Sequence, residues 1–217
     1  MPGSNTFIHR PMIDCFALLN ELRRPQIDLE ALKAKFRARS TEAHPDRFHN
    51  ESDSEKQAVN QRYLELNAAY NCLRQPHERL QHLLELEQGT RPDRLQQIPN
   101  DAMDLFVEVG QLCRYVDAFL HERSEITSPL LKVQAFKRAT EWMEKLKSLK
   151  QRISAQQDAL IIELGSLNAV WLAAPPVGAS NRRDALPLAR LEQIYWGVSY
   201  LSRCSEQIQE RLVQLSF

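Results

Sequence analysis

The sequence predicts an all-α protein, and three observations support this fold class. The 217 residues include only 6 glycines, whereas leucine, glutamine, glutamate and arginine, which favour helices, are abundant. Apolar residues recur at spacings of three and four, as in amphipathic helices. We find no convincing alternation of apolar and polar residues bounded by turns, as a half-buried strand would give. We therefore expect an N-terminal helical hairpin followed by a C-terminal antiparallel three-helix bundle.

Composition narrows the class of partners. Hydrophobic residues make up 43% and charged residues 26% of the chain, as is usual for a soluble globular protein. Basic and acidic residues both number 28, and this balance disfavours general nucleic-acid binding. The most apolar stretch, residues 159–174, is too short to span a bilayer, and residues 1–10 lack an apolar leader. We predict a cytoplasmic protein with neither a nucleic acid nor a membrane as partner.

The first half of the chain is predicted to begin with three helices. Residues 1–11 are expected to be flexible, and a short helix should follow them. Two longer helices are expected over 28–42 and 54–74, with Asp28 and Ser54 as capping residues. Their apolar positions are spaced so that the two helices can pack against each other as a hairpin.

The second half is predicted to form a bundle of three helices, over 101–121, 128–164 and 186–215. A further helix starting at Pro76 should precede it, because proline fits the first turn of a helix. The apolar residues expected to face the core from the long middle helix are Leu130, Val133, Phe136, Ala139, Met143, Leu146, Leu149, Ile153 and Leu160.

A His-Pro-Asp tripeptide, residues His44, Pro45 and Asp46, lies between the second and third predicted helices. The proline stiffens the loop between an imidazole and a carboxylate, so the loop presents a fixed polar surface. The preceding helix carries a local excess of positive charge, which is either a solvated face or a docking surface for an acidic partner. The residues of this predicted patch are Lys33, Lys35, Arg37 and Arg39.

The arrangement of helix, His-Pro-Asp and helix resembles the J-domain family, whose members use the tripeptide to switch on ATP hydrolysis by a DnaK-type (70-kDa heat-shock) chaperone. The segments that carry the resemblance are Phe36–Phe48, Leu66–Leu73 and Pro76–Leu84. A J-domain over 12–76 would be followed by a linking helix and linker over 77–99 and a client-binding bundle over 100–217. That order is similar to HscB, the iron–sulphur co-chaperone family.

The resemblance to HscB implies two partners. His44, Pro45, Asp46 and the basic patch would contact the DnaK-type chaperone, and the bundle would carry an iron–sulphur scaffold protein of the IscU type. The client-binding residues that it implies are Met103, Asp104, Phe106, Val107 and Gly110. The last two stand where the family is expected to carry carboxylates, which leaves a different client open.

Two further positions depart from the family pattern. Arg39 and Ala43 stand where larger apolar residues are usual. Either the second helix packs less tightly, or Arg39 enlarges the basic face. This departure leaves open a second function, that of a helical adaptor whose J-like region no longer activates a chaperone.

Metal and catalytic sites are weakly indicated. His44, Asp46 and His49 could supply three metal ligands, but the rigid loop offers no evident fourth ligand. No nucleophile and base stand together, so we expect no enzyme activity and no cofactor. The bundle's aromatic side chains could line a ligand pocket, but core or surface positions are favoured: Trp142, Trp171, Tyr195, Trp196 and Tyr200.

The four cysteines show no metal-ligand spacing. Each falls within a predicted helix, where a free thiol behaves as a small hydrophobe, and disulfides are not expected. The oligomeric state, including a homodimer, is left open. The cysteines are Cys15, Cys72, Cys113 and Cys204.

Overall fold

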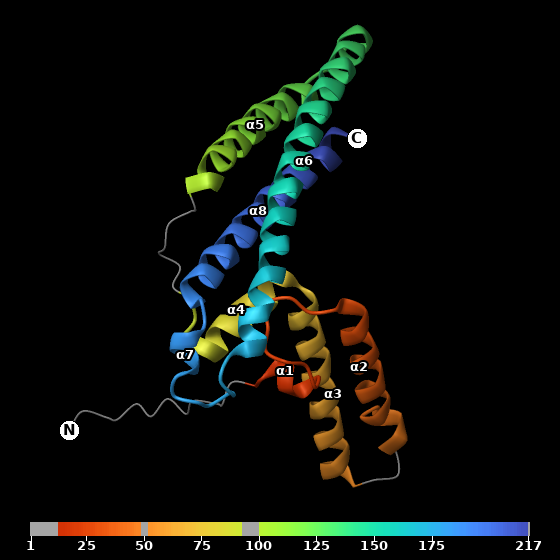
Figure 1. Ribbon diagram of the computed structural model, residues 1–217. Coiled ribbons are helices and arrows are strands. Elements are labelled where there is room, and N and C mark those ends of the chain that lie inside the picture. The colour runs from red at the N-terminus through yellow and green to blue at the C-terminus, as the bar shows by residue number, and fades with distance from the viewer. Residues whose placement is uncertain (1–12, 49–51, 93–99, 217) are drawn as a thin grey trace, which may run out of the picture. The chain divides into compact units, whose positions relative to one another are not determined.

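The computed structural model of the chain describes residues 13–48, 52–92 and 100–216, and within these ranges it is helical without any strand (Figure 1). The predicted all-α class is therefore confirmed. The predicted flexible segment 1–11 lies outside the described residues. No helix in the described part of the chain is long and apolar enough to cross a membrane.

Contacts between residues divide the chain into two compact units, 1–91 and 92–217. Each unit is described by itself. The N-terminal unit contains the helices α1 (Cys15–Leu18), α2 (Leu29–Glu42), α3 (Asp53–Arg74) and α4 (Pro76–Gln88), with a 3₁₀ turn, η1 (Pro45–Phe48), between α2 and α3.

The α2–α3 hairpin forms because the two apolar faces meet as their spacing predicts (Figure 1). Leu32 of α2 and Leu66 of α3 are buried, and the Phe36 and Tyr70 rings stack with centroids 4.4 Å apart. The Asp28 carboxylate caps α2 by accepting the backbone N–H groups of the two residues that follow Leu29. The apolar pairs hold the two helices side by side up to the turn.

The cap of α3 differs from the expectation. Ser52, rather than Ser54, is the N-cap, and it forms a capping box with Glu55. The Ser52 hydroxyl accepts the Glu55 backbone N–H, and the Glu55 carboxylate accepts the Ser52 backbone N–H. Ser54 is too late in the chain to pair with Glu55 in this way, so α3 begins one residue earlier than predicted.

A buried arginine on α4 attaches this helix to the rest of the N-terminal unit. Arg79 is 4% exposed, and its guanidinium donates to the carbonyl oxygens of Pro25 and Leu73, at 2.8 and 2.6 Å. Burial lowers the pKa of Arg79 to about 10, so the side chain remains charged at neutral pH. These bonds join α4 to the end of α3 and to the segment before α2. By its contacts α4 thus belongs to the N-terminal unit, whereas the sequence places it in a linking segment over 77–99.

The C-terminal unit contains α5 (Asn100–Ser124), α6 (Pro129–Ala173), the short α7 (Arg182–Ala185) and α8 (Leu188–Leu215). Helices α5, α6 and α8 share one apolar core (Figure 1). Its buried members include Leu105, Val109, Cys113, Val116 and Phe119 from α5, and Leu201, Cys204, Ile208, Leu212 and Leu215 from α8.

The start of α6 faces away from this core, contrary to the expectation. Leu130, Val133 and Phe136 are 69%, 69% and 74% exposed. The core line of α6 consists of Ala135, Ala139, Trp142, Leu146, Leu149 and Ile153, with Trp142 partly buried, and four of these (Ala139, Leu146, Leu149 and Ile153) are as predicted. Those positions alternate strictly by four and three residues, whereas the three exposed residues are out of phase with that line. The error is confined to these three bulky residues, because the small side chain of Ala135 continues the core line towards the start of α6 in their place.

Candidate functional site

The His-Pro-Asp loop is a short, internally bonded turn between α2 and α3. Proline starts the 3₁₀ turn η1, as its fixed φ favours at the first position of a helical turn. The Asp46 backbone N–H donates to Nδ1 of His44, at 3.3 Å. The His44 ring also lies edge-on to Tyr63 of α3, with centroids 5.6 Å apart. The imidazole is thus held by its own turn and by the neighbouring helix.

Both polar side chains of the loop are accessible. The His44 side chain is 45% exposed and that of Asp46 is 89% exposed. Because Nδ1 of His44 accepts the Asp46 N–H, Nε2 is the ring nitrogen that a partner's acceptor can contact. The loop therefore offers one donor and one carboxylate acceptor to a partner. His49, the third residue of the alternative metal site, lies outside the described residues.

The four cations predicted as one patch divide between two faces of α2, because residues two apart on a helix lie about 200° apart. Lys35 faces the segment after α1, where its Nζ lies 2.6 Å from Oε2 of Glu21 and 2.9 Å from the carbonyl oxygen of Asn20. Arg39 faces the same way and donates to the carbonyl oxygen of Leu18 at 2.8 Å. These two cations hold the N-terminal unit together, which corrects the four-residue patch.

The remaining two cations lie together on the more exposed face. Lys33 lies near Glu30, with the charged atoms 4.0 Å apart. Arg37 is exposed, and its guanidinium makes no ion pair or hydrogen bond with the other residues that the structure describes. The exposed basic patch consists of Lys33 and Arg37, which are one helical turn apart.

A hollow of about 370 Å³ lies beside the loop at the end of the hairpin. Its lining includes the two positions that depart from the family pattern, Arg39 and Ala43. The small side chain of Ala43 leaves space there, and Arg39 extends to the carbonyl oxygen of Leu18 on α1. The full lining is Arg39, Glu42, Ala43, Phe48, Ala58, Val59, Arg62 and Leu66.

The residues expected to bind a client lie on the outer face of α5. Met103, Phe106 and Val107 are 40%, 42% and 48% exposed, while the adjacent Leu105 is 4% exposed and belongs to the core. Added bulk at Gly110 would meet no heavy atom within 4 Å, so the face is open there. Asp104 is also exposed.

This α5 face continues onto α8 through one aromatic contact. The Phe106 ring lies edge-on to Tyr200, with centroids 6.4 Å apart. Tyr200 in turn contacts the ring of Trp196, at 6.1 Å. The sequence did not indicate that Tyr200 extends the α5 face, since α5 and α8 lie at opposite ends of the C-terminal unit's sequence and only packing brings them together.

The cysteines form two different groups. Cys113 and Cys204 are buried in the core of the C-terminal unit, as small hydrophobes are expected to be. Cys15 and Cys72 are only half-buried, and they lie close to each other and to His82. A hydrogen bond from the Cys72 thiol lowers the pKa of Cys15, whereas donating that bond, together with burial, raises the pKa of Cys72. The expectation that all four are merely buried hydrophobes is wrong for this pair.

Comparisons with known proteins agree with this architecture. No protein-family model matches the chain. A segment of 73 residues, 34% of this chain, is 41% identical to a co-chaperone protein HscB homolog from Azoarcus sp. (strain BH72) and 40% identical to one from Cupriavidus taiwanensis. The matched segments cover 41% and 42% of those proteins, so the chain spans about two fifths of the length of the curated relatives that it matches.

Two solved structures have a similar fold. Human co-chaperone protein HscB superimposes with a TM-score of 0.62 at 19% identity, covering 92% of this chain and 82% of that one. Chaperone HscB from Vibrio cholerae gives a TM-score of 0.51 at 17% identity, covering 91% of this chain and 96% of that one. At these identities the likeness shows the fold alone.

The fold and the loop define the class as an all-α protein that joins a J-domain-like helical hairpin to a second helical unit. Within that class, a third of the chain is similar in sequence to HscB co-chaperones and the fold is similar to that of two HscB structures, in agreement with the resemblance inferred from the sequence.

Proposed function

We propose that the protein is a J-domain co-chaperone. It stimulates ATP hydrolysis by a DnaK-type chaperone through the His44-Pro45-Asp46 loop, and it delivers an iron–sulphur scaffold protein, the client, through its C-terminal unit. The observation that carries the proposal is the loop: an accessible imidazole and carboxylate held by a turn at the end of a helical hairpin. The relationship to HscB co-chaperones supports the choice of partners.

The loop acts by differential binding. A co-chaperone shifts its chaperone towards hydrolysis only if it binds the hydrolysis-competent conformation more tightly than the others. The His44 imidazole is fixed by contacts within the unit, so it loses little conformational freedom when it meets a partner. Lys33 and Arg37, on the adjoining helix, steer the approach to an acidic surface.

The C-terminal unit acts by holding the client. Met103, Phe106 and Val107 leave an apolar face on α5 that Tyr200 of α8 extends. Exposed apolar faces of this kind favour protein contacts. A client bound there is tethered to the chain that also engages the chaperone, which raises its effective concentration at the chaperone.

The chaperone half of the proposal is tested by an ATPase assay with a DnaK-type chaperone. His44→Gln should abolish the stimulation, because glutamine cannot reproduce the ring contact with Tyr63 or the imidazole surface. His77→Gln on α4 is the matched control and should stimulate as the wild type does. Circular dichroism should show equal helicity for both variants, since neither side chain is buried in the core.

The same assay separates the co-chaperone from the alternative, a helical adaptor with an inactive J-like domain. An adaptor would leave the chaperone's ATPase rate unchanged with wild type and with both variants. Equal stimulation by wild type and His44→Gln would instead assign the activity to another part of the chain.

A further inference from the structure

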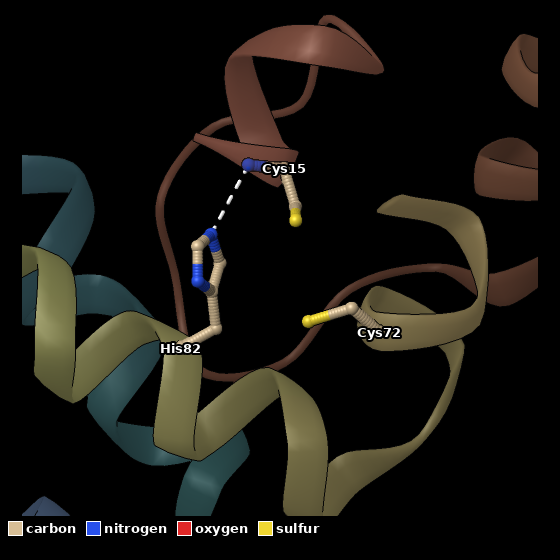
Figure 2. A group of neighbouring side chains, drawn as sticks. All are labelled: Cys15, Cys72 and His82. Carbon is tan, nitrogen blue, oxygen red and sulfur yellow. Dashed lines mark hydrogen bonds between the residues drawn. The ribbon is translucent and has the colours of Figure 1, made fainter. Parts of the chain in front are cut away.

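Three potential metal ligands converge in the N-terminal unit, away from the His-Pro-Asp loop. Cys15 starts α1, Cys72 lies near the end of α3, and His82 lies in the middle of α4. One ligand atom from each, two thiol sulphurs and an imidazole nitrogen, all lie within 4.8 Å of one another. Figure 2 shows the three side chains pointing towards one another from three separate helices.

His82 presents an unprotonated nitrogen, held by a hydrogen bond, to the start of α1. Nε2 of His82 accepts the backbone N–H of Cys15 at 3.1 Å, so this nitrogen carries no proton (Figure 2). The ring also stacks on Phe16, with centroids 6.0 Å apart and planes 9° apart, and it is 8% exposed. An unprotonated imidazole nitrogen that is held in place beside two thiols is the form of histidine that binds metals.

The helices that carry these ligands are fixed by other contacts. The Asp14 carboxylate caps α1 and pairs with Arg23, at 2.7 Å. Arg79, one turn before His82 on α4, is bonded to the carbonyl oxygen of Leu73, the residue after Cys72. The elements that carry the three ligands are therefore also held by contacts that do not involve the ligand side chains.

We propose that Cys15, Cys72 and His82 form a binding site for a thiophilic d¹⁰ divalent ion of the zinc class. Sγ of each cysteine and Nε2 of His82 serve as three ligands, and water or an external donor takes the fourth position. Zn–S bonds of about 2.3 Å and a Zn–N bond of about 2.0 Å place tetrahedral ligands about 3.4–3.8 Å apart. The observed spread of up to 4.8 Å requires a closure of about 1 Å.

Binding exchanges protons for the metal. A sulphur that still carries its proton releases it on bonding to the ion, and Nε2 exchanges the hydrogen bond from the Cys15 N–H for a bond to the ion. The bound ion would link α1, α3 and α4, so it would stabilise the N-terminal unit by mass action. This inference does not depend on the proposed co-chaperone function, since its measurements involve neither the chaperone nor the client.

The test is a zinc titration of the full, reduced and metal-free chain by calorimetry, with thermal unfolding as a second measurement. We expect one Zn²⁺ per chain and a higher melting temperature of the N-terminal unit with Zn²⁺. Cys15→Ala, Cys72→Ala and His82→Phe should each weaken binding at least about tenfold. The phenylalanine retains a ring to stack on Phe16, and circular dichroism checks that each variant is folded.

The matched control is the double variant Cys113→Ala with Cys204→Ala, which removes two thiols from the other unit. It should bind one Zn²⁺ as the wild type does. The proposal is overturned if the reduced wild type binds no zinc, or if the three ligand variants bind it as tightly as wild type. It is also overturned if His82→Phe alone leaves binding unchanged, since the two thiols would then act without the imidazole.

Discussion

At the scale of single residues, α2 shows that a run of cations in a sequence does not predict which of them form an exposed basic surface. Four cations alternate with other residues from Lys33 to Arg39. Two of them make contacts within the N-terminal unit. Lys35 forms an ion pair with Glu21, and Arg39 donates a hydrogen bond to the carbonyl oxygen of Leu18. The Glu21 side chain is only 4% exposed, so its carboxylate depends on its cationic partners.

This division predicts opposite effects for two charge reversals. Arg37→Glu should slow association with a DnaK-type chaperone and reduce its salt dependence, with little change in stability, because exposed charges act through a screened field. Lys35→Glu should instead destabilise the N-terminal unit by roughly 2–4 kcal/mol, because it replaces the cation beside the buried Glu21 with a second carboxylate. Stopped-flow association and urea unfolding measure the two effects. Equal loss of stability in both variants would contradict the assignment.

Arg79 is a buried polar residue that joins α4 to the end of α3 and to the segment before α2. Arg79→Met keeps much of the side-chain volume but leaves the carbonyl oxygens of Pro25 and Leu73 without their donor. We expect a loss of roughly 2–4 kcal/mol, measured by faster hydrogen exchange of the α4 amides. Arg74→Met, at a solvent-facing cation–π contact with Tyr70, is the control and should cost less than about 1 kcal/mol. Unchanged exchange in α4 would contradict this role for Arg79.

At the scale of elements, the hollow at the end of the α2–α3 hairpin is open to solvent and is lined in part by apolar side chains. Ala43→Leu adds apolar atoms to a space lined by Val59 and Leu66, and we expect it to stabilise the unit by about 1 kcal/mol. Ala34→Leu, at an exposed position of α2, should change stability little. Thermal unfolding of both variants provides the comparison. Destabilisation by Ala43→Leu would mean that the hollow closes in solution.

Neighbouring residues on α5 separate packing from client binding. Phe106→Ala should weaken client binding by roughly 1–3 kcal/mol with little loss of stability, as for an exposed anchor at an interface. Leu105→Ala should cost roughly 2–5 kcal/mol of stability, because Leu105 is in the core. Calorimetric titration with the scaffold protein and thermal unfolding measure the two. The apolar face also predicts weak salt dependence of client binding, and a steep dependence would contradict it.

Sequence patterns predicted elements better than they predicted sites. The cap at Asp28 and the start at Pro76 gave correct helix starts, because both signals are local. The core line of α6 was predicted correctly from Ala139 onwards. Its start was wrong, because Ala135 is a weaker apolar signal than the exposed Leu130, Val133 and Phe136 that precede or follow it. The cluster around His82 could not be predicted at all, since three helices far apart in the chain supply its members.

At the scale of the whole molecule, the chain divides into two units, and the proposed function gives each a separate task. The N-terminal unit carries the loop with His44, and the C-terminal unit carries the face around Phe106. Each site is built within its own unit, from contacts that do not involve the other. The proposed function therefore requires only that one chain bears both sites, so that binding the client raises its effective concentration at the chaperone.

The central claim is that the loop drives hydrolysis while the α5 face recruits the client. The most direct test measures the ATPase rate of a DnaK-type chaperone with and without the scaffold protein, after adding wild type, His44→Gln or Phe106→Ala. The account predicts that His44→Gln removes stimulation under both conditions, whereas Phe106→Ala removes only the additional rate that the scaffold protein causes. Undiminished stimulation by His44→Gln, or loss of the scaffold-independent rate with a folded Phe106→Ala, would contradict it.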